Sequence, residues 1–182
     1  MSGHSKWSQI KHKKSATDQK KAKIFSKLSR ALSVAAKEKG KDPSLNPKLR
    51  LMIEKAREAN MPASNIEKAI KKAAGGEGEK DLEEVLYEAF GPSGAAIIIE
   101  AITDNKNRTT NEIKHILNEY GIKLAAPGSA LWAFEKQIEK NEWNAKHLIA
   151  FESAADKEKL QNLIEELENH DDTQSITTNI KL

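Results

Sequence analysis

Residues 82–102 have the sequence LEEVLYEAFGPSGAAIIIEAI, and this stretch decides the architecture of the second half of the chain. Residues 82–90 and 94–102 are rich in Val, Tyr, Phe and Ile, which are typical of strands. The tetrapeptide Gly91-Pro92-Ser93-Gly94 between them is typical of a turn. The stretch therefore predicts two adjacent strands.

The chain beyond residue 102 alternates between helix and strand patterns. Thr109 or Thr110 is expected to cap a helix that ends at Gly121. The remaining elements expected from periodicity are a strand at Ala130–Phe134, a weaker strand at His147–Phe151, an amphipathic helix at Ser153–Glu168 and a half-buried strand at Gln174–Ile180. From residue 94 the order is βαββαβ, which predicts an α + β fold with a ferredoxin-like α/β sandwich and residues 82–90 as an extra edge strand.

Three helices are predicted before this α/β part. The first covers Asp18–Lys39 and is capped by Gly40. Asn46-Pro47 opens the second, which continues to about Asn60. The third is expected to begin with a capping box formed by Ser64 and Glu67 and to end at Gly75-Gly76. These helices predict an N-terminal three-helix bundle, preceded by an extended arm at residues 4–16, where no period is visible.

The two halves of the chain carry opposite charge. Residues 1–80 hold 20 Lys and Arg against 8 Asp and Glu, whereas residues 81–182 hold 10 against 19. The polar, glycine-rich stretch 75–80 separates them. We expect a basic helical domain with its arm at 1–76, a linker at 77–81 and an α/β domain at 82–182.

The arm and the first helix have the composition of a nucleic-acid-binding surface. Lysines pair with phosphates, and the indole of Trp7 among them can stack on a base. The alternative interpretation of these residues is a charged helix face that contacts only solvent. The candidate residues are Lys6, Trp7, Lys11, His12, Lys13, Lys14, Lys20, Lys21, Lys23, Lys27 and Arg30.

Two other segments allow binding interpretations. The short turn at residues 61–63 permits a helix-turn-helix that presents Lys68, Lys71 and Lys72 to a groove, although plain bundle packing explains the same pattern. Asp104–Thr109 follows a strand and opens a helix, so it forms either a second candidate anion site or an ordinary loop with an N-cap. The residues of that site are Asn105, Asn107, Arg108 and Thr109.

Catalytic and metal-binding patterns are missing from the sequence. The chain has no cysteine, and its five histidines are scattered. Adjacent Asp171 and Asp172 fit a solvated turn better than a metal site. We therefore expect no enzyme activity, cofactor or metal. Since no long apolar stretch and no secretory signal is found, we also expect a cytoplasmic protein without a membrane partner.

Several motifs resemble one known family. Gly3-His4-Ser5-Lys6-Trp7, Ile10-Lys11-His12-Lys13-Lys14 and Asp104–Thr109 are similar to the pattern of the YebC/PmpR-type regulatory proteins, which include a mitochondrial translational activator. The resemblance implies a non-enzymatic, nucleic-acid-binding protein without a small-molecule substrate. It leaves two roles open: binding of ribosomal RNA, mRNA or the ribosome in translation, which we favour, and binding of DNA in transcription.

The chain departs from the family pattern at one place. The resemblance implies three domains, but the third is nearly absent here, with a remnant near residues 135–152. We expect Trp132 and Trp143 to cover part of the surface that the third domain would bury.

Overall fold

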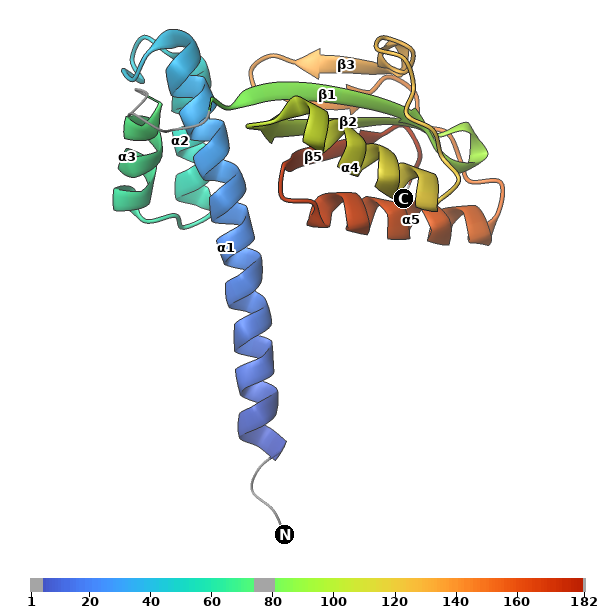
Figure 1. The fold of residues 1–182 in the computed structure, drawn as a ribbon, viewed down its shortest axis with the longest axis horizontal. Helices are drawn as coiled ribbons and strands as arrows, with labels where there is room; N and C mark the ends of the chain where they lie inside the picture. The colour runs from blue at the N-terminus through green and yellow to red at the C-terminus, as the bar shows by residue number, and fades with distance from the viewer. Residues whose placement is uncertain (1–4, 74–80, 182) are drawn as a thin grey trace. The chain divides into compact units, whose positions relative to one another are not determined.

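The computed structural model describes the backbone of residues 5–73 and 81–181, with side chains from Asp18 onward in these ranges. The chain forms two compact units, Met1–Ala74 (unit 1) and Gly75–Leu182 (unit 2) (Figure 1). Within the described ranges, no helix combines the length and apolar character needed to cross a membrane.

Unit 1 consists of three packed helices, as the sequence predicts. They are α1 (Ser5–Lys39), α2 (Pro47–Glu58) and α3 (Ala63–Lys72) (Figure 1). Side chains at helical spacing on the three helices form one apolar core, because each helix presents one stripe to the others. The fully or nearly fully buried members of this core are Leu32, Ala35, Ala36, Leu49, Met52, Ile53, Ala56, Met61, Ile66 and Ala69.

The prediction of an extended arm at residues 4–16 is wrong, because the backbone of residues 5–16 belongs to α1. The segment lacks a hydrophobic period, but it also lacks Gly and Pro, and it is rich in lysine, a good helix former. Once the buried part of α1 has formed, adding one more turn needs no new nucleation. The helix therefore extends toward the N-terminus without an apolar face.

Apart from the start of α1, one predicted helix end in unit 1 is wrong. Gly40 has φ +91°, and its N–H donates to the carbonyl of Ala36 at 3.0 Å, as expected of a C-terminal cap. The Ser64–Glu67 capping box is wrong, because α3 begins after Pro62 without a side-chain cap. Proline fixes φ near the helical value, so the chain enters the helix directly after it. Gly75-Gly76 and most of the predicted linker lie outside the described residues.

Asn46 joins α1 to α2. Its Oδ1 accepts the N–H of Leu49 at 3.0 Å, and its Nδ2 donates to the carbonyls of Ala35 and Gly40 at 2.7 and 2.8 Å. The side chain is fully buried. One amide therefore satisfies an orphan donor of α2 and two carbonyls at the end of α1.

Replacing Asn46 by Ala is expected to lower the free energy of unfolding by about 2–3 kcal/mol, because the buried carbonyls lose their donor along with the cap. Asn46→Ser keeps a capping oxygen but reaches neither carbonyl, so we expect an intermediate loss. Urea unfolding followed by far-ultraviolet circular dichroism checks this. Wild-type stability in the Ala variant would contradict the linking role.

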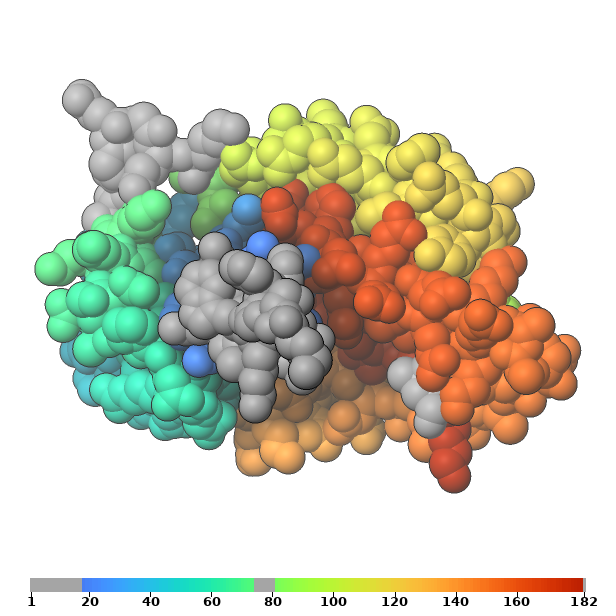
Figure 2. Space-filling view, turned by 90° about the horizontal axis from the view of Figure 1, so that it is seen from below, coloured from blue at the N-terminus to red at the C-terminus, as the bar shows by residue number. Residues whose placement is uncertain are grey.

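Unit 2 is built around a three-stranded antiparallel sheet. Its strands are β1 (Glu83–Phe90), β2 (Ala96–Thr103) and β5 (Thr173–Thr178), in the order β1-β2-β5. The helices α4 (Lys106–Glu119) and α5 (Ala154–Asn169) lie side by side (Figure 2) and pack on one face of the sheet. Their shared core contains Ile97, Ile99, Ile113, Leu117, Leu160, Leu163 and Leu167.

A small hairpin covers the other face of the sheet. It consists of β3 (Phe134–Gln137) and β4 (Glu142–Ala145), which pair only with each other. Ile98 of β2 packs there with Phe134 and Trp143. Because β2 is buried on both faces, its apolar run is continuous instead of alternating.

The α + β fold and both helices on one face agree with the sequence, but two predicted strands differ. The predicted strand at 130–134 is a 3-10 turn at Leu131–Ala133 that leads into β3, and 147–151 holds only an isolated bridge from Ile149 to Ile180. A four-stranded ferredoxin-like sheet would need a middle strand beside β2. That edge is taken by β1, because the connection of five residues, 91–95, makes the pairing of consecutive strands entropically inexpensive.

The two tryptophans of this region differ in environment. Trp143 is half-buried against the sheet, and its Nε1–H donates to Glu100 at 3.0 Å. Trp132 is 65% exposed. The exposure of Trp132 contradicts the prediction that it covers part of the surface that the third domain would bury, and for Trp143 this stays a prediction.

Candidate nucleic-acid interface

The basic residues of α1 lie on a defined side of the helix. Phe25, Leu28 and Leu32 pack into the core of unit 1. At 100° per residue, Lys23, Lys27 and Arg30 fall on the opposite side. The local sequence thus separates an apolar stripe from a basic stripe, and core packing turns the basic stripe away from α2 and α3.

The described part of α1 becomes fully exposed toward its N-terminus. Asp18, Lys20, Lys21 and Ala22 are exposed, and the core of unit 1 begins only at Phe25. Lys23, Lys27 and Arg30 are half-buried and each has an interaction partner in the chain. Lys20 and Lys21 are therefore the most accessible cations among the described candidates on α1.

The other candidates precede the described side chains. They are Lys6, Trp7, Lys11, His12, Lys13 and Lys14. The structure places their backbone in α1 from Ser5 onward. A straight helix carries its residues at a rise of about 1.5 Å each, so these positions continue the axis of α1 away from the core that starts at Phe25.

The second candidate site, at the start of α4, is occupied by internal contacts. Asn105, and not Thr109 or Thr110, caps the helix, since its Oδ1 accepts the N–H of Arg108 at 3.1 Å. Asn107 is exposed on the first turn. Thr109 is fully buried, and its hydroxyl donates to Asp172 Oδ2 at 2.6 Å.

Arg108 is surrounded by carboxylates. Its guanidinium lies 2.6 Å from Asp172, 3.0 Å from Asp104 and 3.6 Å from Glu112. The hydrogen bond to Asp172 raises the pKa of Arg108 further above its ordinary value, so the side chain stays charged. With three carboxylates around one guanidinium, the local field disfavours an additional anion. These contacts argue against the anion-site interpretation.

Asp172 is a buried structural residue, so the expectation of a solvated turn is wrong for it. It is 2% exposed, whereas its neighbour Asp171 is exposed. Besides its side-chain bonds, its carbonyl accepts the N–H of Ile102 at 2.8 Å. Asp172 therefore ties the end of α5 and the start of β5 to the end of β2 and the start of α4.

One group near this cluster has the residue types of a metal site. Ligand atoms of Glu112, His170 and Asp172 lie within 4.8 Å of one another. His170 Nε2 is 2.9 Å from Glu112, and its Nδ1 accepts the N–H of Asp172 at 3.3 Å. The guanidinium of Arg108 forms ion pairs with both carboxylates and so supplies the positive charge that a metal ion would otherwise supply. The group is thus satisfied as an ion-pair network.

Sequence reasoning missed the buried carboxylate of Glu88. This side chain is 3% exposed and accepts the N–H groups of Gly128, Ala130 and Leu131 at 2.5, 2.6 and 3.1 Å. The available signal was a charged residue between Tyr87 and Ala89, in the apolar second half of the strand. Glu88 holds the 128–131 loop against β1 and so positions the approach to β3.

The chain is similar to proteins of one family over most of its length. Residues 5–76 match the family model described as the TACO1/YebC protein N-terminal domain. Residues 82–141 match the model described as the TACO1/YebC second and third domain. The second match ends in the connection between β3 and β4.

Individual relatives give the same result. The chain is 57% identical over 136 residues to a "probable transcriptional regulatory protein" of Thermoanaerobacter pseudethanolicus, covering 75% of this chain and 55% of the relative. It is 54% identical over 137 residues to one of Thermosipho africanus, covering 75% and 54%. The chain thus spans about half the length of these curated relatives.

A solved structure also matches. The crystal structure of a conserved hypothetical protein from Aquifex aeolicus is similar with a TM-score of 0.79 and 30% sequence identity. The match covers 88% of this chain and 90% of that one. The similarity therefore extends over both units of the fold.

Proposed function

The chain belongs to the TACO1/YebC family, and from this premise we propose that it is a non-enzymatic regulatory protein that binds nucleic acid through α1. One observation carries the proposal. The first 37 residues hold 10 Lys and Arg against one acidic residue, and α1 places this charge on one continuous helix. The names of the relatives support a regulatory role.

The chemistry of the surface favours binding that tolerates many sequences. Lysine ammonium groups pair with phosphates as point charges and carry little base information. Trp7 adds an aromatic ring for stacking on unpaired bases. For these reasons we propose ribosomal RNA or mRNA as the target, in the cytoplasm, with a role in translation.

A second candidate is a DNA-binding regulator of transcription. It is favoured by the printed names of the relatives, which are probable transcriptional regulatory proteins. The short connection from α2 to α3, residues 59–62, also keeps the helix-turn-helix interpretation open. On this alternative, α3 would face a groove of duplex DNA.

Co-sedimentation with ribosomes distinguishes the two candidates. Tagged protein in a lysate near physiological salt is centrifuged after treatment with DNase or with RNase. We expect migration with ribosomal particles that survives DNase and is lost with RNase, because the lysines contact RNA phosphates. Binding should fall steeply as salt rises, since each neutralised phosphate releases counterions.

The opposite pattern would support the DNA candidate. Absence from ribosomal particles, together with recovery in a DNase-sensitive fraction, would refute the RNA target and keep the nucleic-acid proposal. Binding to neither nucleic acid at low salt would refute the proposed function as a whole.

A further inference from the structure

A second row of lysines lies on α3. Lys68, Lys71 and Lys72 are all exposed, at spacings of three and four residues, so they are neighbours on one face of the helix. Ile66 and Ala69 of the same helix are buried in the core of unit 1. The lysines therefore form a compact row, the α3 row, on the outer face of α3.

The α3 row is not neutralised by its surroundings. Among the residues that the structure describes, none of the three lysines makes an ion pair or a side-chain hydrogen bond. The outer face of α2 differs, because Arg50, Glu54, Arg57 and Glu58 mix both signs there. The exposed face of α3 carries these three lysines and one carboxylate, Glu67, so it has a net positive charge, whereas the signs on α2 balance. The excess of positive charge indicates an anionic partner for α3.

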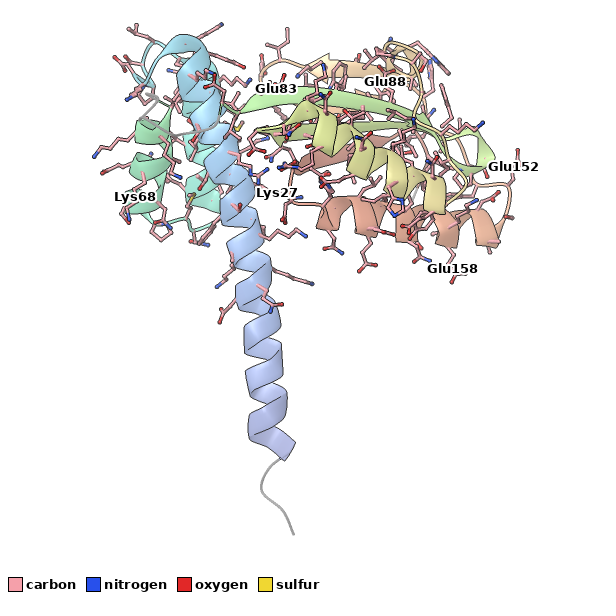
Figure 3. The ribbon with its side chains drawn as sticks, viewed as in Figure 1. Lys27, Lys68, Glu83, Glu88, Glu152 and Glu158 are labelled. Carbon is pink, nitrogen blue, oxygen red and sulfur yellow. The ribbon has the colours of Figure 1, made fainter. Side chains whose placement is uncertain are left out.

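The α3 row and the basic residues of α1 face different directions. α3 packs against α1, and the hydroxyl of Ser33 donates to the carbonyl of Ala69 at 2.8 Å. Lys68 lies on the side of α3 away from α1, while Lys27 lies on the far side of α1 (Figure 3). One straight phosphate backbone cannot touch two surfaces that face away from each other.

We infer that the α3 row of Lys68, Lys71 and Lys72 is a second phosphate-binding surface, so that unit 1 holds two nucleic-acid segments at once, one on α1 and one on α3. The inference rests on the proposed function for its first segment. The occupant is the phosphate backbone of a nucleic acid, because ammonium groups without carboxylate partners bind phosphates and distinguish bases poorly.

Lys71 and Lys72 also lie in the last turn of α3, where cations stabilise the helix dipole by about 0.3–1 kcal/mol. A purely structural role would require only a positive charge near the helix end. The test therefore needs a readout of nucleic-acid bridging as well as a readout of stability.

The experiment measures bridging by the full chain. A biotinylated single-stranded RNA on beads captures a second, fluorescent, non-complementary RNA only when the protein binds both. We expect capture by wild type and a loss of about tenfold or more for Lys68→Ala/Lys71→Ala/Lys72→Ala, since three phosphate contacts disappear. The protein itself should still bind the beads, through α1.

Two controls make the result specific. Lys114→Ala/Lys123→Ala/Lys157→Ala removes the same charge from exposed positions of unit 2 and should leave capture unchanged. Lys68→Arg/Lys71→Arg/Lys72→Arg keeps the charges and should retain capture. Circular dichroism should show the helix content of wild type in all variants.

The outcomes separate the two proposals. Wild type that binds one RNA without capturing the other, or an α3 variant that captures as well as wild type, overturns the second surface and leaves the proposed function intact. An equal loss in the unit 2 control also overturns it, because net charge alone would then explain the effect. Wild type that binds no RNA and no duplex DNA overturns the proposed function itself.

Discussion

Replacing Lys11, Lys13 and Lys14 together by Glu is expected to weaken nucleic-acid binding by more than about a hundredfold at moderate salt. The change replaces three cations, in the most basic segment of the chain, by anions that repel phosphate. The core of unit 1 begins at Phe25, so the fold should be unaffected. Fluorescence anisotropy with a labelled RNA, measured over a series of salt concentrations, gives both the affinity and the slope with salt.

A matched variant separates position from net charge. Lys114→Glu/Lys123→Glu/Lys157→Glu makes the same change in net charge on exposed positions of unit 2, which is already acidic. Its affinity should stay within a few-fold of wild type, because these residues are not part of the proposed binding surface. If the variant in α1 bound as tightly as wild type, the assignment of the interface to α1 would be wrong.

Replacing Asp172 by Ala is expected to lower the free energy of unfolding of unit 2 by about 2–4 kcal/mol. The carboxylate accepts hydrogen bonds from Arg108 and from the buried hydroxyl of Thr109, both at 2.6 Å. Its removal leaves Arg108 with Asp104 and Glu112 as carboxylate partners. The buried hydroxyl of Thr109 loses its charged acceptor and keeps only Thr103 and the carbonyl of Asn105 as partners. Urea unfolding followed by tryptophan fluorescence reports on this unit, since Trp143 is half-buried in it.

Asp171→Ala is the control for this prediction. The residue is next in sequence and exposed, so its loss should change stability by less than about 0.5 kcal/mol. Asp172→Asn keeps the shape and one acceptor oxygen, and we expect a loss between those of the other two variants. Equal stabilities of the Asp171 and Asp172 variants would show that the network contributes nothing to folding.

Most helix ends and the first two strands could be predicted from the sequence. Gly40 and Asn46 act as caps where the sequence indicates them, and β1 and β2 flank the predicted turn. These features depend on a few neighbouring residues, so local pattern is sufficient. The start of α1 could not be predicted, because the sequence of residues 5–16 shows no hydrophobic period.

The candidate sites divide in a similar way. The lysines of α1 and α3 can be found by composition, and their outward direction follows from helical spacing. The role of the segment at 104–109 cannot be found from composition and spacing. Whether Arg108 is open to a ligand or held by Asp172 depends on a residue 64 positions later in the chain.

The sequence by itself therefore determined the helical segments, their buried faces, the strand–turn–strand of unit 2 and the separation of charge between the two halves. Each of these is set by hydrogen bonds and periodicity over a few residues. Only the tertiary structure decided that β3–β4 forms a separate hairpin, that Glu88 is a buried partner of backbone N–H groups, and that Asp172 is a buried partner of Arg108. These contacts join residues that are far apart in the chain. The local sequence around one of them does not show which distant residue it contacts.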